Sequence, residues 1–490
     1  MKINKKKFNS VYFLILFSFF ICLVSAKYTL NKYDKNLISP EGKYYHAMIK
    51  GDVHRYFTHG FEIKEALKLG INYFETGRQN FTKYLFPRVM AIYYLIFDYN
   101  LFEDQLKNII KQGIHFNYLI FQISLYYSCI LFLYFQLRKI IDNSILFWII
   151  LFLSLEPTIF QYQLSFWSES IFSSMQIILI GLILNNTQKN IRYFFIGFVL
   201  SLLAIQRSNG FFYIVPILLY FYITIGFKFN KKLPLLLIGY SIFLIFVGYH
   251  NYIRSNKFYI IPNEMKAVMH AYVIPNIISK ESLEIEKSKT INFIKVQKLE
   301  INNDQSFKRY IEQEDYSRYS FIFCENEERK ENTEYLKVCN YLEKRSYELI
   351  FSNLVSTAKY ITKQSMHFIL LNPFHIYSDN QFISGKVYYG SELHQKLIPY
   401  RMIYSFIIYS ICLIGLFKII KLKDKKILLF LFISILYFFL ILSWHGNTRY
   451  FLPILFYLSF FFAFGVADIY KIVKSNLLTK KLSNNNFIQF

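Results

Sequence analysis

Residues 1–26 read MKINKKKFNSVYFLILFSFFICLVSA, and this stretch decides the fold class. Residues 1–7 are basic through Lys2, Lys5, Lys6 and Lys7, and residues 8–26 are apolar. An apolar run of about 18 or more residues can cross a bilayer as a helix, and lysines mark its cytoplasmic end. Residues 24–26 (Val-Ser-Ala) resemble a signal-peptidase site, so a retained anchor helix and a cleaved signal both stay open. In both cases we expect residue 27 onward to lie outside the cytoplasm.

The composition excludes an ordinary soluble protein. The 490-residue chain is 54% hydrophobic, 20% aromatic and 18% charged. Soluble proteins have about 45–50% apolar and about 25% charged residues, and they do not repeat long apolar runs. A net charge of +24 suggests nucleic-acid binding in a soluble chain, but lysine and arginine mark the cytoplasmic loops of a membrane protein. We therefore predict an integral, all-α polytopic membrane protein with membrane lipids, and no nucleic acid, as partners.

Nine further apolar segments predict membrane-spanning helices, which with residues 8–26 makes about ten. They are residues 116–137, 144–162, 165–185, 192–206, 211–227, 233–250, 401–417, 427–444 and 450–470. With the N-terminus inside, every short loop assigned to the cytoplasm is basic, as the positive-inside rule requires. These loops carry Arg138 and Lys139; Lys189 and Arg192; Lys228, Lys231 and Lys232; Lys418, Lys421, Lys423, Lys425 and Lys426; and the tail carries Lys471, Lys474, Lys480 and Lys481. Both termini are then cytoplasmic, in a multi-pass protein of the plasma (inner) membrane.

This threading predicts three parts. Residues 1–250 form an N-terminal membrane module whose first outer loop is 27–115, residues 251–400 form a large extracytoplasmic region that is mainly helical, and residues 401–490 hold three membrane helices and a cytoplasmic tail. In the first loop, residues 61–73 have the spacing of an amphipathic surface helix. Residues 84–97 are apolar but short and contain Pro87-Arg88, which indicates an interfacial or re-entrant helix. Residues 334–363 have helical periodicity.

The five cysteines show no metal-site spacing. Cys22, Cys129 and Cys412 lie in apolar runs, where a thiol is a small packing group. Cys324 and Cys339 lie in the hydrophilic region, where they are either free or joined in a disulfide. No cluster of histidines and acids has ligand spacing, so the sequence requires no cofactor and does not support a divalent metal.

Strongly polar residues gather at the outer ends of the predicted spans. They are Glu41, Glu156, Glu169, Arg207, His250, Arg254, His445 and Arg449. A charge deep in the bilayer costs roughly 2.5–3.5 kcal/mol, so this gathering indicates a shared polar cavity. Arginine binds phosphate bidentately, and a carboxylate can take the proton of an attacking hydroxyl. The set predicts group transfer from a lipid-linked phosphate donor.

Each of these residues also has a structural interpretation. Glu41 can be a solvated loop residue, and Glu169 can simply pair with Arg207. The histidines can be hydrogen-bonded packing residues, and the arginines can extend to the interface. Tyr44 and Tyr45 can stack on sugar rings or anchor the interface, whereas for Trp167 we favour the anchor role.

Four motifs resemble the GT-C superfamily of polyprenyl-phosphate-sugar glycosyltransferases, the class of protein O-mannosyltransferases and the aminoarabinose transferase of lipid A. They are SPEGKYYHAMIKGD at 39–52, SFWSESIF at 165–172, LLAIQRSNGFFYIVPILLY at 202–220 and HGNTRYFLPILFYLSFFFAFG at 445–465. The motifs cover most of the membrane part in order, and residues 251–400 have no counterpart. The first-loop acid is usually Asp in that family, whereas here it is Glu41. The Arg207 motif lacks the proline that often follows the arginine.

The resemblance implies a sugar donor on undecaprenyl or a similar polyprenyl phosphate. It implies Glu41 as the general base, with inversion at the anomeric carbon. Arg207, Arg254 and Arg449 would hold the lipid phosphate, and Glu169 would orient the acceptor or pair with an arginine. Further substrate-binding residues would be Tyr44, Tyr45 and His445. The acceptor can be a lipid, a glycan or a protein.

Two other functions remain open. An O-antigen polymerase or ligase also works at the outer leaflet with arginines and histidine, but it needs no acid in the first loop. A lipid-linked-oligosaccharide transporter is expected to have internal repeats and charges at mid-bilayer. The sequence shows neither of these last two features.

Overall fold

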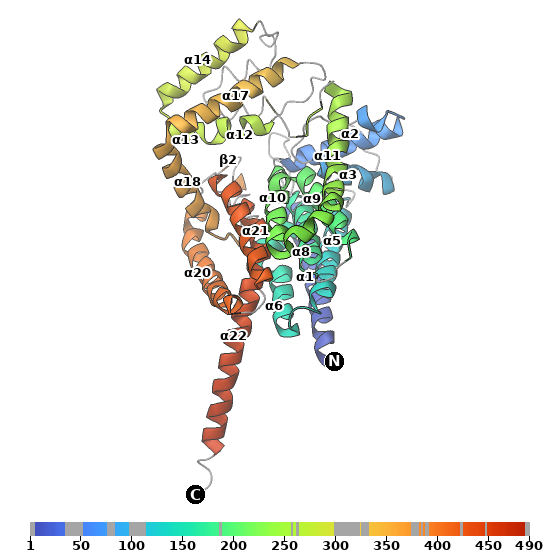
Figure 1. The fold of residues 1–490 in the computed structure, drawn as a ribbon, viewed down its shortest axis with the longest axis vertical. Coiled ribbons are helices and arrows are strands. Elements are labelled where there is room, and N and C mark those ends of the chain that lie inside the picture. The colour runs from blue at the N-terminus through green and yellow to red at the C-terminus, as the bar shows by residue number, and fades with distance from the viewer. Residues whose placement is uncertain are drawn as a thin grey trace.

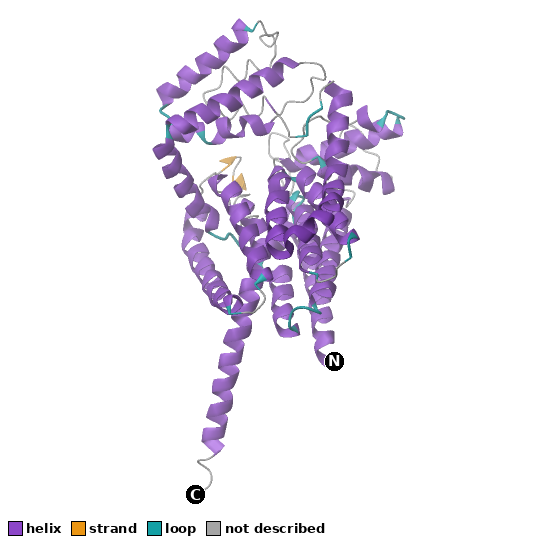
Figure 2. Cartoon of the chain, in the orientation of Figure 1, coloured by secondary structure: helices purple, strands orange, loops and turns teal. Residues whose placement is uncertain are grey.

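The computed structural model describes residues 5–34, 52–75, 84–97, 114–185, 189–255, 258–260, 264–297, 324, 333–373, 382–383, 386–387, 392–421, 425–445 and 448–485. Within these residues the regular structure is helical, except for a short hairpin in which β1 (Phe382–Ile383) pairs antiparallel with β2 (Lys386–Val387) (Figure 2). Glu41, Tyr44 and Tyr45 lie outside the described residues.

Six helices of the described chain are long and apolar enough to cross a membrane, which confirms the predicted helical membrane protein. They lie in α1 (Lys5–Asp34), α5 (Ile114–Leu137), the run of η2 (Ser208–Tyr213), α10 (Ile214–Ile225) and η3 (Gly226–Lys231), α11 (Leu233–Ser255), α20 (Glu392–Ile420) and α22 (Leu452–Asn485). Three other predicted spans are shorter apolar helices: α8 (Glu169–Leu184), α9 (Ile191–Gln206) and α21 (Lys426–Leu442).

The predicted span 144–162 is not one straight helix. It is divided into α6 (Asn143–Leu155) and α7 (Pro157–Gln163), whose axes differ by 53°. Pro157 lacks an N–H and suits the first position of a helix, and the Glu156 carboxylate accepts the backbone N–H of Ile159 at 2.7 Å as an N-cap. The Glu-Pro pair therefore ends one helix and starts the next.

Glycines let two pairs of membrane helices cross at close range. A Cβ on Gly197 of α9 would lie 2.0 Å from the carbonyl oxygen of Leu236 in α11, and Gly239 faces Phe194 in the same crossing. In the crossing of α20 with α22, a Cβ on Gly415 would lie 1.7 Å from the carbonyl oxygen of Phe461. Small residues at helix crossings are typical of membrane proteins, where backbone packing replaces the hydrophobic effect.

The first loop contains two of the expected helices. α2 (Asp52–Lys68) begins and ends earlier than the helix expected at 61–73. It ends at Lys68 because Gly70, at φ 74°, terminates it, and the backbone N–H groups of residues 69–71 donate to carbonyl groups of residues 65–67. η1 (Tyr73–Glu75) follows, and α3 (Leu85–Ile96) is the short apolar helix predicted at 84–97. Pro87 is tolerated because it lies in the first turn of α3.

The helix bundle has two distinct ends (Figure 1). At one end α1 begins, and its Tyr12 packs on Tyr134 near the end of α5 at 5.6 Å. The same end carries the start of α9 and the start of α11, where Lys232 Nζ lies 3.4 Å from the hydroxyl of Tyr193. We call it the basic end. α22 extends beyond the bundle in the direction of the start of α1, and the helices of the region 251–400 lie at the opposite end, the cap end (Figure 1).

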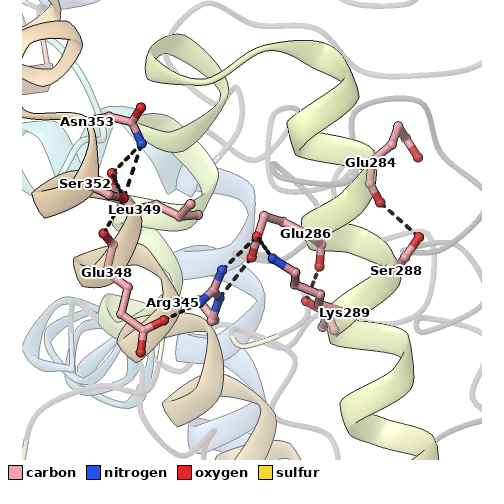
Figure 3. Close-up of polar contacts among 10 residues, drawn as sticks. Glu284, Glu286, Ser288, Lys289, Arg345, Glu348, Leu349, Ser352 and Asn353 are labelled. Atoms are coloured by element: carbon pink, nitrogen blue, oxygen red, sulfur yellow. Dashed lines mark hydrogen bonds and ion pairs between the residues drawn. The ribbon is translucent and has the colours of Figure 1, made fainter.

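In its described residues the region 251–400 is mainly helical, as the sequence predicted. It contains α12 (Glu264–Tyr272), α13 (Ile274–Ile277), α14 (Lys280–Val296), α17 (Thr333–Ser352) and α18 (Leu354–Ile369). Arg345 of α17 donates to both carboxylate oxygens of Glu286 in α14, at 2.9 and 2.7 Å, and also binds Glu348 (Figure 3). Cys324 and Cys339 are joined in a disulfide. A bidentate ion pair and a disulfide therefore hold the cap together.

Candidate functional site

The centre of the candidate site is a buried ion pair between Glu169 and Arg207. Arg207 Nη1 lies 2.7 Å from Glu169 Oε1, with the side chains 6% and 1% exposed respectively. Glu169 is the first residue of α8, where the positive end of the helix dipole favours a carboxylate. Arg207 follows the last residue of α9 in an extended conformation, so it leaves the helix where its side chain can meet Glu169.

The local chain geometry after Arg207 depends on glycine. The N–H of Gly210 donates to the carbonyl of Arg207 at 2.8 Å and closes a 3-10 turn. A Cβ on Gly210 would lie 2.4 Å from the carbonyl oxygen of Leu203, closer than any side chain permits. The sequence Arg-Ser-Asn-Gly therefore forms a tight turn from α9 into α10, and this turn fixes the direction of Arg207.

Aromatic rings flank the arginine. Its guanidinium carbon lies 5.9 Å from the centre of the Phe172 ring and 5.3 Å from that of Tyr450, distances that allow cation–π attraction. Tyr450 belongs to η5 (Thr448–Phe451), directly before α22. Three of the four sequence motifs thus meet at one place, because α8, the end of α9 and η5 all contact Arg207.

A layer of amides and hydroxyls surrounds the pair. Gln206 Nε2 donates to the carbonyl of Ser168 at 3.0 Å, and the Ser168 hydroxyl lies 3.3 Å from Glu169 Oε2. The Ser170 hydroxyl donates to Gln163 Oε1 at 2.6 Å. Several buried atoms of this region have no hydrogen-bond partner among the described residues: Gln122 Oε1, Gln163 Nε2, Gln206 Oε1, Asn209 Oδ1 and Asn209 Nδ2. Such donors and acceptors suit hydroxyl groups, from water or from a polar ligand.

Glu156 has a structural role in the described chain. One carboxylate oxygen accepts the N–H of Ile159, and the other accepts the Tyr404 hydroxyl of α20 at 2.6 Å. Both oxygens are engaged and the side chain is buried. Glu156 therefore caps α7 and ties it to α20.

A second buried cation, Arg88 of α3, was not singled out by the sequence. Its guanidinium donates to the Tyr73 hydroxyl and to the carbonyl of Tyr84, both at 2.8 Å, and its Nη2 lies 3.4 Å from Nδ1 of His250. The side chain is 7% exposed. Among the described residues no carboxylate pairs with it. Arg88 thus carries a buried positive charge with no acidic partner in the described part of the chain, and its place beside a proline in an apolar segment was the only signal in the sequence.

The two arginines lie at the same end of the bundle. Tyr84, whose ring centre is 3.3 Å from the Arg88 guanidinium, packs in one apolar cluster with Ala204 and Ile205 of α9. Since α9 begins at the basic end, its last turn and Arg207 lie at the cap end. The Nδ1 of His250 also lies 2.6 Å from the Tyr84 hydroxyl, and the His250 side chain is buried.

Other predicted site residues are placed through their backbone alone. Arg254 lies in the last turn of α11, His445 ends η4 (Ser443–His445), and Arg449 lies in η5. Their side chains, like all of Glu41, Tyr44 and Tyr45, are outside the described part. Within the described part, no three histidines, cysteines or acids form a group that can hold a metal ion.

The chain was compared with protein-family models, curated proteins and solved structures, and none of them matches it.

Proposed function

We propose that the chain is an integral membrane glycosyltransferase of the GT-C type. In this proposal it transfers a sugar from a polyprenyl-phosphate donor to a lipid, glycan or protein acceptor at the extracytoplasmic face of the plasma (inner) membrane. The observation that carries the proposal is Arg88, a buried guanidinium with no acidic partner among the described residues. A buried cation is costly unless an anion compensates it, and a lipid phosphate at the membrane interface is such an anion.

The roles of the other residues follow the same chemistry. Glu41 takes the proton of the acceptor hydroxyl while that oxygen attacks the anomeric carbon, and the polyprenyl phosphate leaves. Arg207 contacts Glu169 through Nη1, which leaves Nε and Nη2 for the phosphate. Arg254 and Arg449 complete the phosphate site. His445, Tyr44, Tyr45 and the buried amides near Glu169 hold the sugar and the acceptor.

The proposed topology has about ten spans, with α8, α9 and α21 completing the set that the six long helices and the α6–α7 pair begin. The basic end is cytoplasmic in this proposal, because the lysines and arginines of the loops α5–α6, α8–α9 and α10–α11 gather there. The cap end, with both buried arginines, is then extracytoplasmic.

The test uses the full chain in nanodiscs with a panel of polyprenyl-phosphate sugars. Wild type is expected to bind at least one donor and to release polyprenyl phosphate from it. Glu41→Gln should bind the donor but not release the phosphate. Arg88→Gln should bind it about 10- to 100-fold more weakly, the loss expected for charge-assisted hydrogen bonds.

Arg138→Gln is the matched control, because Arg138 follows α5 at the basic end and its guanidinium lies over the Phe135 ring at 4.8 Å. This variant should keep both binding and release. If wild type binds no polyprenyl-phosphate sugar, the proposal fails, and a polymerase, a ligase or a transporter takes its place. Normal release by Glu41→Gln would remove Glu41 from the mechanism.

A further inference from the structure

α18 has an apolar face that no other described helix covers. The large side chains on this face are strongly exposed, at 71% for Val355 and 65% for Met366. Leu354, Ile361 and Ile369 are exposed on the same side, because positions 354, 355, 358, 361, 362, 366 and 369 share one face of a helix with 3.6 residues per turn. Water contact with so many apolar groups is unfavourable, and such a patch marks an interaction surface.

Another side of α18 is firmly packed, so the exposure is not that of an undocked helix. Phe368 is buried and contacts the rings of Phe439 in α21 and Phe451 in η5, with ring centres 6.0 and 5.2 Å apart. The Tyr360 hydroxyl donates to the carbonyl of Tyr272 in α12 at 3.0 Å. α18 therefore connects the cap to the membrane bundle and keeps one face turned outward.

The lower end of α18 is joined to the middle of a membrane span. The Tyr409 hydroxyl of α20 donates to the carbonyl of Ile369, and the N–H of Leu371 donates to the Ser405 hydroxyl at 2.9 Å. The apolar span in α20 is Leu397–Ile420, so Tyr409 lies near its centre. The end of α18 is thus at the depth of the bilayer interior, not above it.

The length of α18 then places its upper end. Its 16 residues extend for about 24 Å at about 1.5 Å per residue. Half of a bilayer measures about 15 Å of hydrocarbon and about 20–22 Å with the headgroups. A helix that starts near mid-bilayer therefore ends at the headgroup level. In Figure 1, α18 descends from the cap toward α20 along one margin of the molecule.

Charge on α18 agrees with this position. The helix contains Lys359 and Lys363 and no acidic residue. Lysines beside an apolar face are typical of helices that contact anionic lipid headgroups. Exposed apolar side chains also lie on α20 beside the lower end of α18, at Ile403, Phe406 and Ile407. The exposed face of α18 and that of α20 can form one lipid-contacting surface.

We infer that α18 is a membrane-embedded helix that anchors the cap in the outer half of the bilayer. Its apolar face, within residues 354–369, contacts lipid chains, and Lys359 and Lys363 contact anionic headgroups. This anchoring is independent of the chemistry proposed above, and it adds a lipid contact outside the predicted spans.

The test measures membrane depth in the full chain by spin labels, with the protein in nanodiscs. Labels are attached at Val355→Cys and Met366→Cys, and Ile285→Cys on α14 is the matched control because it is also an exposed apolar position. The three native free cysteines are buried and the other two are bonded, so labelling should be confined to the introduced thiol. Labels at 355 and 366 should collide more with oxygen and less with a water-soluble nickel reagent than the label at 285, and the label at 366 should be the deeper.

Equal nickel accessibility at all three positions would overturn the inference, as would spin–spin broadening that shows a second copy on the face. Headgroup contact is tested with the label at 355 in discs with and without phosphatidylglycerol. The anionic lipid should move this label deeper in the otherwise unmodified chain. It should not do so after Lys359→Gln and Lys363→Gln, and the same depth in both kinds of disc would refute the headgroup contact.

Discussion

At the scale of single residues, the site depends on charges that are removed from water. Glu169 and Arg207 are both nearly inaccessible and lie within 2.7 Å of each other. Desolvation of two ions costs about as much as their attraction returns, so such a pair adds little net stability. Removal of either partner is nevertheless strongly destabilising, because the remaining ion is buried with no opposite charge beside it.

The first prediction follows from this pair. Glu169→Gln or Arg207→Gln should each destabilise the protein by about 3–5 kcal/mol, because a charge is left unpaired in the bundle. The double variant should recover part of the loss. Thermal denaturation in one detergent measures all three variants, with Arg138→Gln as the control. A double variant whose loss equals the sum of the two single losses would contradict the coupling.

The second prediction concerns pH and the cap. Burial of His270 in α12 lowers its pKa to about 4, with Arg345 acting in the same direction and Glu286 opposing it. In the unfolded chain this histidine has a pKa near 6.5, so between pH 6.5 and pH 4 the unfolded state binds a proton that the folded state does not. Protonation therefore favours unfolding in this range. The cap should lose about 2 kcal/mol of stability between pH 7 and pH 5, at about 1.4 kcal/mol per pH unit below 6.5.

Hydrogen exchange of the cap amides at the two pH values checks this loss, with His270→Gln as the variant that should lack it. Glu286 cannot produce the same effect. Burial raises the pKa of Glu286, but Arg345 and Lys289 lower it by more, so the net pKa is lowered. The stability that ionised Glu286 contributes is therefore lost only at pH values below the ordinary carboxyl pKa. An unchanged loss in His270→Gln would refute the role of this histidine.

At the scale of elements, backbone contacts decide which helices meet. The crossing of α20 with α22 brings Gly415 against the carbonyl of Phe461, and the crossing of α9 with α11 uses Gly197 and Gly239. A carbonyl oxygen in a helix cannot move aside as a side chain can. These crossings therefore tolerate no larger residue without a shift of a whole helix.

The third prediction tests one crossing. Gly415→Ala should destabilise the protein by about 1–3 kcal/mol, the usual cost of overpacking. Gly181→Ala is the control, because a Cβ there would meet side-chain atoms of Phe132 and Gln136 at 3.0 Å or more. Thermal denaturation compares the two. Equal melting temperatures would show that α20 and α22 can separate at no cost.

At the scale of the whole molecule, the two ends differ in chemistry. Lys418, near the end of α20 that leads away from the cap, pairs with Asp468 in the middle of α22 at 2.7 Å. The cap instead contains the disulfide between Cys324 and Cys339. Disulfides persist in oxidising compartments, which agrees with a cap outside the cytoplasm.

The fourth prediction tests this orientation in intact cells. A membrane-impermeant maleimide should label Ile285→Cys in α14, and it should not label Lys421→Cys after α20 until the membrane is opened. Both residues are at exposed positions, so accessibility of the thiol itself is matched. The reverse pattern would invert the proposed topology.

The sequence alone determined the class of the protein and most of its helices, because apolar length and lysine position act locally. The spans in α1, α5, α11, α20 and α22 follow from composition, and so does the helical cap. The disulfide was left open by the sequence, because pairing of two cysteines depends on where the fold places them.

Only the tertiary structure decided which polar residues meet. It joined Glu169 to Arg207, a pairing that the sequence had left open beside a catalytic role, and it placed Glu156 as a helix cap. It also revealed Arg88, whose burial beside Tyr84 and His250 arises from elements more than 160 residues apart. The apolar face of α18 could not be distinguished from an ordinary core face, because periodicity shows that a face is apolar but not what covers it. Contacts between distant segments decide that, and these are a property of the folded chain.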